Sequence, residues 1–349
     1  VDFKAFTNLT DAVGGVYIDV DKHYFNDTKK YDQIDVRPGY QLLHGVDALD
    51  YVRYRMDNNM DFGRQHRQQT FLTALREQAM GWDLGFKLPG LIQALTDNIQ
   101  TTISFDEIRN LAYWVLTKLD GGQIRQQTVS GAIQTVEGVS FVIPSEGVLE
   151  QKVADFMDPT PAATASQTTV ATLTSDVDVP TTAGSTDIVV DSSQFMTDPN
   201  FVPDSALWSE IAAQMPFTVM APGYLPQDYK YYQRNPEGSG GYDIDTGGGS
   251  AKGLKMVYRL VRNGTSYDQY LGIMETDWLD APAASPGRQV VYNGTTFTIV
   301  GTYDRTERVW WEKDGVLYWV SNTISHYLNP TELVKVAASM ITIPSGATP

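Results

Sequence analysis

Residues 51–80 read YVRYRMDNNMDFGRQHRQQTFLTALREQAM, and this stretch decides much of the predicted fold. It predicts a long helix that begins with Asp61 as its N-cap and runs to the end of the stretch. On that helix Asp61, Arg64 and Gln68 share one face, which becomes apolar from Leu72 onward. The pattern therefore predicts a helix whose later turns pack into the core and whose first turns line a pocket.

Strands and helices alternate around this long helix. The expected elements are a strand at 16–20, a short helix at 46–52, helices at 91–99 and 105–119, and strands within 129–142. The helix at 105–119 is preceded by Ser104-Phe-Asp-Glu, which is a capping-box pattern. Such alternation predicts a layered α/β domain, with its boundary at residue 157.

The stretch 51–80 is locally basic, with five arginines against three acidic residues. Arginines in the first turns of a helix oppose the helix dipole, and a bound anion would reverse the sign of that interaction. Arg53 and Arg55, at the end of the preceding helix, are expected to close the other side of such an anion site. Guanidinium groups match the oxygens of phosphate or pyrophosphate. The alternative is an exposed helix whose arginines pair with neighbouring acids, and the spacing alone leaves both open.

Three segments of the chain carry a family resemblance. They are VDFKAFTNLTDAVGGVYIDV at 1–20, PGYQLLHGVDALDYVRYR at 38–55 and DFGRQHRQQTFLTAL at 61–75. Together they resemble the second half of the LytR-CpsA-Psr family of cell-envelope phosphotransferases, over about residues 1–143. The R-x-R motif followed by D-F-G-R-x-x-R-Q is the specific part of the likeness.

The resemblance implies a fold and an activity. It implies a partial α/β/α sandwich whose pocket holds a polyprenyl (pyro)phosphate lipid. Members of the family move a glycopolymer from its polyprenyl-pyrophosphate carrier to peptidoglycan with the help of Mg²⁺. The implied location is the extracellular face of the membrane or the cell envelope, with a membrane anchor in the full-length protein.

The motif also implies roles for individual residues. Arg53 and Arg55 would hold the pyrophosphate, and Arg64 and Gln68 would contact the same head group. Asp61 would orient the arginines or reach the metal. The motif includes Arg67 as well, although the helical wheel places it at the margin of the pocket face. Of the apolar residues that could line a lipid tunnel, core packing explains each equally well: Phe71, Leu72, Leu75, Val115 and Leu119.

One departure from the family matters most. The family's first half, with its metal-binding acids and a further arginine, has no counterpart in these 349 residues, so most Mg²⁺ ligands would lie outside them. We therefore expect half a pocket and an uncovered sheet edge near residues 16–20. Whether this chain is an enzyme by itself stays open. The rival hypothesis is a non-catalytic extracellular structural or surface-assembly protein that reuses the fold fragment and partners with itself.

Composition excludes several classes of protein. With 42 acidic and 26 basic residues the net charge is −16, which argues against a general nucleic-acid binder. The chain contains no cysteine, which excludes disulfide scaffolds, thiolate zinc sites and cysteine nucleophiles. The basic stretch is thus an exception within an acidic chain.

The remainder of the chain predicts a linker and a second domain. Residues 158–203 are rich in Thr, Ala, Ser and Pro, as is typical of a linker. Within 204–343, short strands alternate with turn signals at Asn263-Gly264, Asn293-Gly294 and Asp314-Gly315. We expect an α+β domain with an antiparallel sheet and flanking helices. Its many aromatic residues are expected to form cross-strand pairs and core, and the alternative is sugar stacking.

Overall fold

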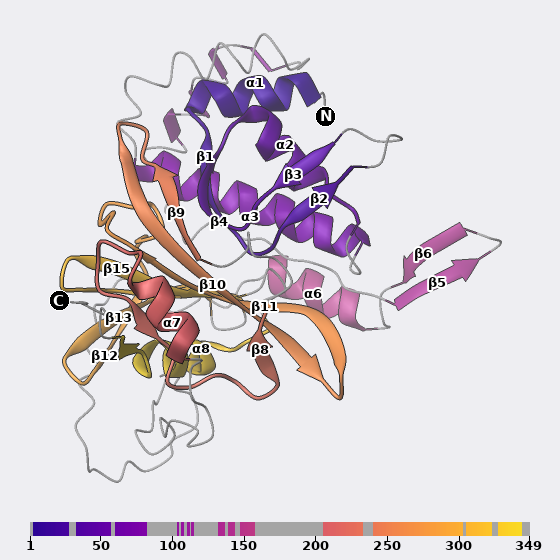
Figure 1. Cartoon of the computed structure of the whole chain (residues 1–349). Helices are drawn as coiled ribbons and strands as arrows, with labels where there is room; N and C mark the ends of the chain where they lie inside the picture. The colour runs from indigo at the N-terminus through magenta and orange to yellow at the C-terminus, as the bar shows by residue number, and fades with distance from the viewer. Residues whose placement is uncertain are drawn as a thin grey trace, which may run out of the picture. The chain divides into compact units, whose positions relative to one another are not determined.

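The computed structural model of the chain is shown in Figure 1. It describes residues 3–27, 33–56, 60–81, 205–232, 240–302, 305–322 and 327–343, together with short pieces between 103 and 157. Two compact units result, one made of residues 1–101 with 169–349 and the other of residues 102–168. The expected linker at 158–203 and the expected helix at 91–99 lie outside the described residues. The domain boundaries at 157 and 203 therefore stay predictions.

The N-terminal part of the first unit is a small mixed α/β layer. In chain order its elements are α1 (Phe3–Val13), β1 (Val16–Val20), β2 (Tyr24–Asn26), β3 (Ile34–Val36), β4 (Gly39–Leu43), α2 (Gly45–Arg53) and α3 (Met60–Gly81). The strand expected at 16–20 and the helix expected at 46–52 are confirmed. β1 pairs with β4 and β2 pairs with β3, both in antiparallel orientation. Figure 1 shows α1, α2 and α3 packed around these strands.

Glycine makes the tight turn from α1 into β1. Gly14 and Gly15 both have positive φ values, of 91° and 89°. The backbone N–H of Gly15 donates to the carbonyl of Thr10 at 2.9 Å, which closes the end of the helix. A Cβ at Gly15 would lie 2.7 Å from the side chain of Leu42 on β4. The turn therefore needs glycine both for its backbone conformation and for the close approach of β4.

The outer edge of β1 is bonded by a side chain. Among the described residues β1 pairs only with β4, so its other edge has no neighbouring strand in this part of the chain. At Tyr17, however, the side-chain amide of Gln78 on α3 accepts from the backbone N–H at 2.8 Å and donates to the carbonyl at 3.0 Å. Gln78 is only 4% exposed. Its amide thus satisfies the strand edge where a neighbouring strand would otherwise bond.

Two predictions about α3 are corrected. The helix begins at Met60, so Asp61 lies in its first turn and is not the N-cap. The apolar end of the predicted stripe is also wrong at Leu72, which is 54% exposed, while Phe71 is buried in the core cluster against Phe6. The buried face is rotated because Arg67, with no exposed surface, takes an interior position four residues before Phe71.

The second unit contains a β-hairpin and a helix. Its elements are β5 (Ala132–Val136), β6 (Val139–Ile143) and α6 (Val148–Met157), and β5 pairs with β6 as an antiparallel hairpin. This confirms the strands expected within 129–142. The capping box is also confirmed, since Glu107 accepts from the backbone N–H of Ser104 at 2.8 Å and Ser104 Oγ accepts from the N–H of Glu107 at 3.4 Å.

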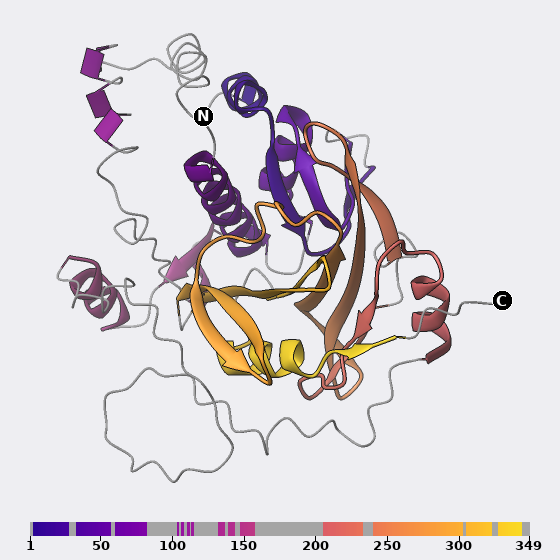
Figure 2. The same ribbon diagram turned by 90° about the vertical axis from the view of Figure 1, so that its left-hand side faces the viewer.

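The C-terminal part of the first unit is an antiparallel sheet of eight strands with helices beside it. The strand order is β12-β13-β14-β15-β11-β10-β8, and β9 pairs with β10. The bounds are α7 (Ser205–Ala212), β7 (Met220–Ala221), β8 (Tyr229–Tyr231), β9 (Gly240–Asp245), β10 (Ser250–Arg262), β11 (Thr265–Thr276), β12 (Arg288–Tyr292), β13 (Thr295–Thr302), β14 (Arg305–Lys313), β15 (Val316–Ser321), α8 (Pro330–Ala338) and β16 (Ile341–Thr342). Figure 2 shows α8 beside the sheet, where it contacts β13, β14 and β15.

The predicted hairpin turns and cross-strand pairs are confirmed. Asn263, Asn293 and Asp314 have φ values of 50°, 47° and 52°, and each is followed by a glycine with positive φ. Trp310 pairs with Trp319 across the last of these hairpins. Trp319 has no exposed surface, as expected for a core side chain. Neither ring of this pair is exposed for stacking on a sugar, which was the alternative.

This sheet is covered on both faces. One face packs with α7 and α8 around a core that includes Trp311 and Leu333. The other face meets β1 and β4, where Tyr40 joins a core cluster with Met274 and Trp319. Six successive residues of β10 are buried, which requires cover on both faces because side chains alternate along a strand. The N-terminal layer and the C-terminal sheet are therefore fused into one compact unit.

Candidate functional site

The first part of the candidate site is the end of α2. Arg53 ends the helix and pairs with Asp50, with Nη2 to Oδ1 at 2.8 Å and Nε to Oδ1 at 3.0 Å. Tyr54 caps the helix, and its backbone N–H donates to the carbonyl of Asp50 at 3.1 Å. Arg55 follows outside regular secondary structure and is exposed. The alternative in which arginines pair with nearby acids thus holds for Arg53, with Asp50 as the partner.

The second part of the site is the first half of α3. Arg64 is half-buried and Gln68, one turn later, is exposed. These two side chains can reach a ligand from solvent. Asp61 lies in the first turn of the same helix, where an acidic residue is favourable to the helix dipole.

Arg67 connects the two parts. Its side chain is fully buried, and its Nη2 donates to the carbonyl of Tyr54. Its guanidinium carbon lies 5.0 Å from the ring centroid of Tyr24 and 5.4 Å from that of Tyr54. The helical-wheel placement of Arg67 at the margin of the pocket face is therefore wrong, since Arg67 is an interior residue. Its bond to Tyr54 brings α3 against the segment that carries Arg53 and Arg55.

A group of tyrosines supports this buried arginine. The Tyr24 ring packs edge-on against Tyr51 and Tyr54, with centroids 5.5 Å and 5.0 Å apart. The Tyr24 hydroxyl donates to Asp21 at 2.5 Å. Burial, and then the Asp21 charge, raise the pKa of Tyr24 well above its usual value, while Arg67 acts in the opposite direction. Tyr24 therefore stays neutral and presents its ring to the cation.

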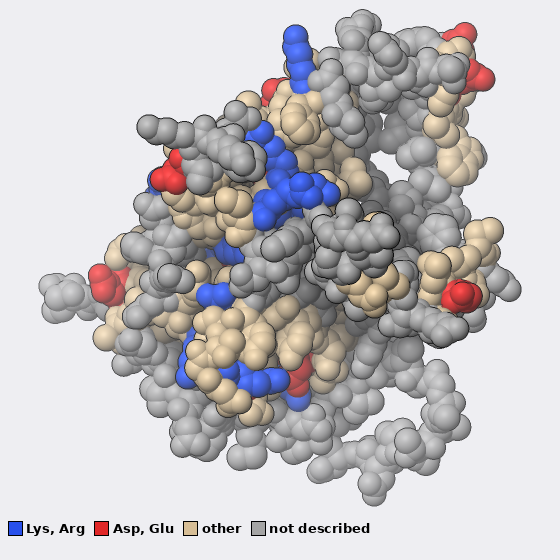
Figure 3. Space-filling model, turned by 90° about the vertical axis from the view of Figure 1, so that its right-hand side faces the viewer, with Lys and Arg blue, Asp and Glu red and all other residues tan. Residues whose placement is uncertain are grey.

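Basic side chains gather on part of the surface. Figure 3 shows Lys and Arg side chains close together on one face of the described part of the molecule, against the overall charge of −16. Such a concentration of positive charge raises the local concentration of anions. This arrangement suits an anionic ligand.

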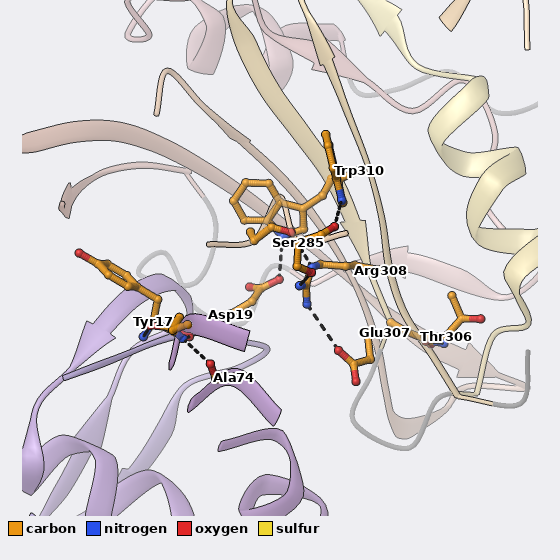
Figure 4. Close-up of polar contacts among 12 residues, drawn as sticks. Tyr17, Asp19, Ala74, Ser285, Thr306, Glu307, Arg308 and Trp310 are labelled. Carbon is orange, nitrogen blue, oxygen red and sulfur yellow. Dashed lines mark hydrogen bonds and ion pairs between the residues drawn. The ribbon is translucent and has the colours of Figure 1, made fainter. Parts of the chain in front are cut away.

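A separate cavity lies where the N-terminal layer meets the C-terminal sheet. Its volume is about 100 Å³, and it is lined by β1 and α3 on one side and by β14 and β15 on the other. Figure 4 shows Asp19 on one side and Arg308 with Glu307 on the other. A water molecule occupies about 30 Å³ of liquid, so the cavity holds a few waters or one small solute. None of the six motif residues lines it, and it is too small for a polyprenyl chain.

A buried ion pair sits beside this cavity. The ammonium group of Lys255, on β10, binds a carboxylate oxygen of Asp19 on β1 and donates to the carbonyl of Val20 at 2.8 Å. The other carboxylate oxygen of Asp19 accepts from Nε1 of Trp319 at 3.1 Å. Lys255 is 2% exposed. The contact joins the two parts of the unit and leaves Asp19 engaged with protein donors.

Sequence reasoning missed the residues of this junction. Lys255 stands within the apolar run of β10 and Asp19 within the apolar strand β1. A charged residue inside a strand that is buried on both faces needs a partner, and that was the available signal. The sequence did not indicate that the two strands meet.

The described residues do not form a metal site by themselves. No group of three or more His, Cys, Asp or Glu in this part of the chain is arranged to hold a cation. Asp19, a carboxylate at the cavity, is already bound to Lys255 and Trp319. The described residues therefore do not supply a complete set of Mg²⁺ ligands.

Comparison with known proteins identifies the N-terminal part. Residues 1–155 match the model of the LytR_cpsA_psr family. This part of the chain belongs to the LytR-CpsA-Psr family. The match includes β1, α2 and α3, and with them all six motif residues.

Two curated relatives and one solved structure are similar to this chain. The chain is 28% identical over 142 residues to the polyisoprenyl-teichoic acid–peptidoglycan teichoic acid transferase TagU of Enterococcus faecalis, covering 40% of this chain and 45% of that protein. It is 32% identical over 110 residues to TagV of Bacillus subtilis, a transferase of the same name, covering 31% and 28%. The crystal structure of B. subtilis TagV matches with 25% identity and a TM-score of 0.38, over 46% and 63% of the two chains. The chain thus spans less than half the length of these two curated relatives.

None of the helices in the described residues is long and apolar enough to cross a membrane.

Proposed function

We propose that this LytR-CpsA-Psr segment serves in an enzyme that transfers glycopolymers from a polyprenyl-pyrophosphate carrier to peptidoglycan. The names of the TagU and TagV relatives support the substrate class. The observation that carries the proposal is the link between Arg67 and the Tyr54 carbonyl, because it joins the R-x-R segment to the helix that carries Arg64. The layer formed by residues 3–81 would be part of an α/β/α sandwich at the outer face of the cell envelope.

In this proposal the polar side chains of the R-x-R segment and of the first half of α3 bind the head group. Arg53, Arg55 and Arg64 supply positive charge and paired N–H donors to the pyrophosphate oxygens. Gln68 adds an amide donor from the next turn of α3. Asp61 would hold the arginines in orientation. Mg²⁺ remains an expectation from the family, and its ligands would have to come mostly from other residues.

In the proposed reaction these residues form no covalent bond with the substrate. A peptidoglycan hydroxyl forms a new O–P bond to the phosphorus that carries the polymer, and the P–O bond of the pyrophosphate bridge breaks. Polyprenyl phosphate leaves with the bonding electron pair, and the hydroxyl proton passes to a base. Catalysis of phosphoryl transfer depends on positioning and charge neutralisation. Arginines around the bridge would stabilise the charge that develops on the leaving phosphate.

The proposal is tested by calorimetric titration with farnesyl pyrophosphate as a soluble probe. We expect binding by the wild-type chain and a loss of about ten-fold to a hundred-fold in affinity for Arg64→Ala, since hydrogen bonds between charged groups contribute about 1.5–3 kcal/mol. Arg288→Ala, at an exposed arginine of β12, is the matched control and should bind normally. Inorganic pyrophosphate should compete and farnesol should not. Equal affinities for the two variants would overturn the assignment of Arg64.

The rival hypothesis of a non-catalytic surface-assembly protein gains no support from these comparisons. The TagU and TagV relatives carry transferase names. Of the aromatic rings beside the Asp314-Gly315 turn, Trp311, Tyr318 and Trp319 are buried and Trp310 is partly buried.

A further inference from the structure

Arg67 differs from the other motif arginines in its surroundings. Arg64 is half-buried and Arg55 is exposed, whereas Arg67 has no exposed surface. Its guanidinium lies against the rings of Tyr24 and Tyr54, at 5.0 Å and 5.4 Å. A group enclosed in this way presents no donor to solvent. The membership of Arg67 in the motif therefore calls for a role other than contact with a ligand.

The hydrogen bond made by Arg67 indicates that role. It donates to the carbonyl of Tyr54, which is the residue between Arg53 and Arg55. Tyr54 also caps α2, because its N–H donates to the carbonyl of Asp50. The peptide groups on both sides of Tyr54 in the R-x-R segment are therefore fixed. The N–H is held by α2 itself and the carbonyl is held by α3. On α3, Arg64 lies three residues before Arg67 and so on the adjoining turn.

We propose that Arg67 is a positioning residue, which sets the R-x-R segment relative to α3 and does not touch the ligand. The consequence for pyrophosphate binding rests on the proposed function, but the positioning itself does not. Without the bond from Arg67, the segment that carries Arg53 and Arg55 loses its tie to the helix that carries Arg64. The converging geometry of the anion site would then be lost while its charged groups are all retained.

The guanidinium group is needed for this task. It is planar and weakly hydrated, so it can lie on an aromatic ring and donate in its own plane at the same time. A lysine ammonium is compact and strongly hydrated, and it cannot satisfy both contacts in this interior. The Tyr24 ring is itself held by its hydroxyl bond to Asp21. Arg67→Lys therefore preserves the positive charge but cannot keep both the ring contact and the hydrogen bond.

The test uses the absence of cysteine from the chain. Spin labels are attached at Met56→Cys, directly after the R-x-R segment, and Leu72→Cys, on α3. Both positions are exposed, at 56% and 54%, and neither is one of the six motif residues. Double electron–electron resonance then gives the distribution of distances between the segment and the helix, with no ligand present.

We expect a narrow distribution in the otherwise wild-type chain and a broadened or displaced one in Arg67→Lys. Arg64→Lys is the matched control and should leave the distribution unchanged. Thermal unfolding followed by circular dichroism shows that each variant is folded. If Arg67→Lys does not fold, Tyr54→Leu removes one ring and keeps the carbonyl, and it should broaden the distribution to a smaller extent. An unchanged distribution in the folded variant overturns the proposal.

A binding measurement separates this proposal from the proposed function. Farnesyl pyrophosphate affinity should fall at least ten-fold in Arg67→Lys, although the number of positive charges is unchanged. If the wild-type chain binds no farnesyl pyrophosphate but the distance distribution still depends on Arg67, the proposed function fails and the positioning role stands. If binding is normal in Arg67→Lys, the positioning role is overturned.

Discussion

Two regions of the first unit each bury a basic side chain, and they stabilise it in different ways. At the junction with the C-terminal sheet, Lys255 is 2% exposed and binds the carboxylate of Asp19. Beneath the R-x-R segment, Arg67 is fully buried, packs on two tyrosine rings and donates to a backbone carbonyl. The junction therefore shows direct charge pairing and the arginine region shows stacking of a delocalised cation.

The difference follows from the chemistry of the two cations. An ammonium group is a strongly hydrated point charge, so its burial is compensated by an anion. A guanidinium group is more weakly hydrated and interacts well with aromatic faces. The contacts also differ in range, because Lys255 and Asp19 are 236 residues apart in sequence whereas Arg67 and Tyr54 are 13 apart. The junction thus stabilises the whole unit, and Arg67 organises a local site.

The largest effect is expected at the junction. Lys255→Met leaves the Asp19 carboxylate without its cation in a largely buried position, which should lower the free energy of unfolding by about 3–5 kcal/mol. Urea denaturation followed by tryptophan fluorescence measures the loss. The double variant Lys255→Met with Asp19→Leu should recover most of it, because no unpaired charge remains. A single variant as stable as the wild type would show that the junction does not depend on this pair.

A buried carboxyl that is hydrogen-bonded to the backbone sharpens the comparison. Glu275 has no exposed surface and accepts from the backbone N–H of Met220, at 3.1 Å and 3.2 Å to its two oxygens. Burial raises the pKa of Glu275 well above its usual value of 4.5, and the hydrogen bond from Met220 opposes this only in part. The folded state therefore keeps a proton that the unfolded state releases.

The pH dependence of stability follows from that shift. The contribution of neutral Glu275 to the free energy of unfolding is complete below pH 4.5, the usual pKa of a glutamate. It is lost as the pH rises toward and through the raised pKa of the folded state. One such group gives a slope of up to about 1.4 kcal/mol per pH unit. Urea denaturation between pH 5 and pH 8 should show the free energy of unfolding falling, and Glu275→Gln should remove that slope. Identical slopes of the free energy of unfolding against pH in the wild type and in Glu275→Gln would contradict the assignment of this pH dependence to Glu275.

The smallest effect is expected at the rim of the junction. The Tyr17 hydroxyl donates to the carbonyl of Asp245 at 2.8 Å in an exposed position. Tyr17→Phe removes this one bond and should lower the free energy of unfolding by about 0.5–1 kcal/mol. The same denaturation experiment measures it. A loss as large as that of Lys255→Met would show that the rim, and not the buried pair, holds the two parts together.

Much of the local structure could be predicted from sequence because its signals are local. The Gly14-Gly15 turn and the three hairpins within 204–343 depend on residues that need positive φ. The capping box at Ser104 likewise lies within four residues. The six site residues came from a motif that is confined to residues 53–68.

The rest depended on contacts between distant segments. The helical wheel for α3 placed Leu72 on the inward stripe and Arg67 at its margin, whereas Leu72 is 54% exposed and Arg67 is fully buried. Only the rings of Tyr24 and Tyr54 make that interior position favourable. In the same way, Lys255 and Asp19 form an ion pair although 236 residues separate them in sequence. The sequence of either strand does not indicate which residue is its partner.

The most direct test of this account is to record the arginine Nε–Hε signals by nuclear magnetic resonance while pyrophosphate is added. The signals are assigned by single arginine-to-lysine substitutions. The account predicts that the signals of Arg53, Arg55 and Arg64 shift together and saturate at one midpoint, while the signal of Arg67 stays in place. An Arg67 signal that shifts with the others as a ligand would, or no shift at any of the four, would contradict it.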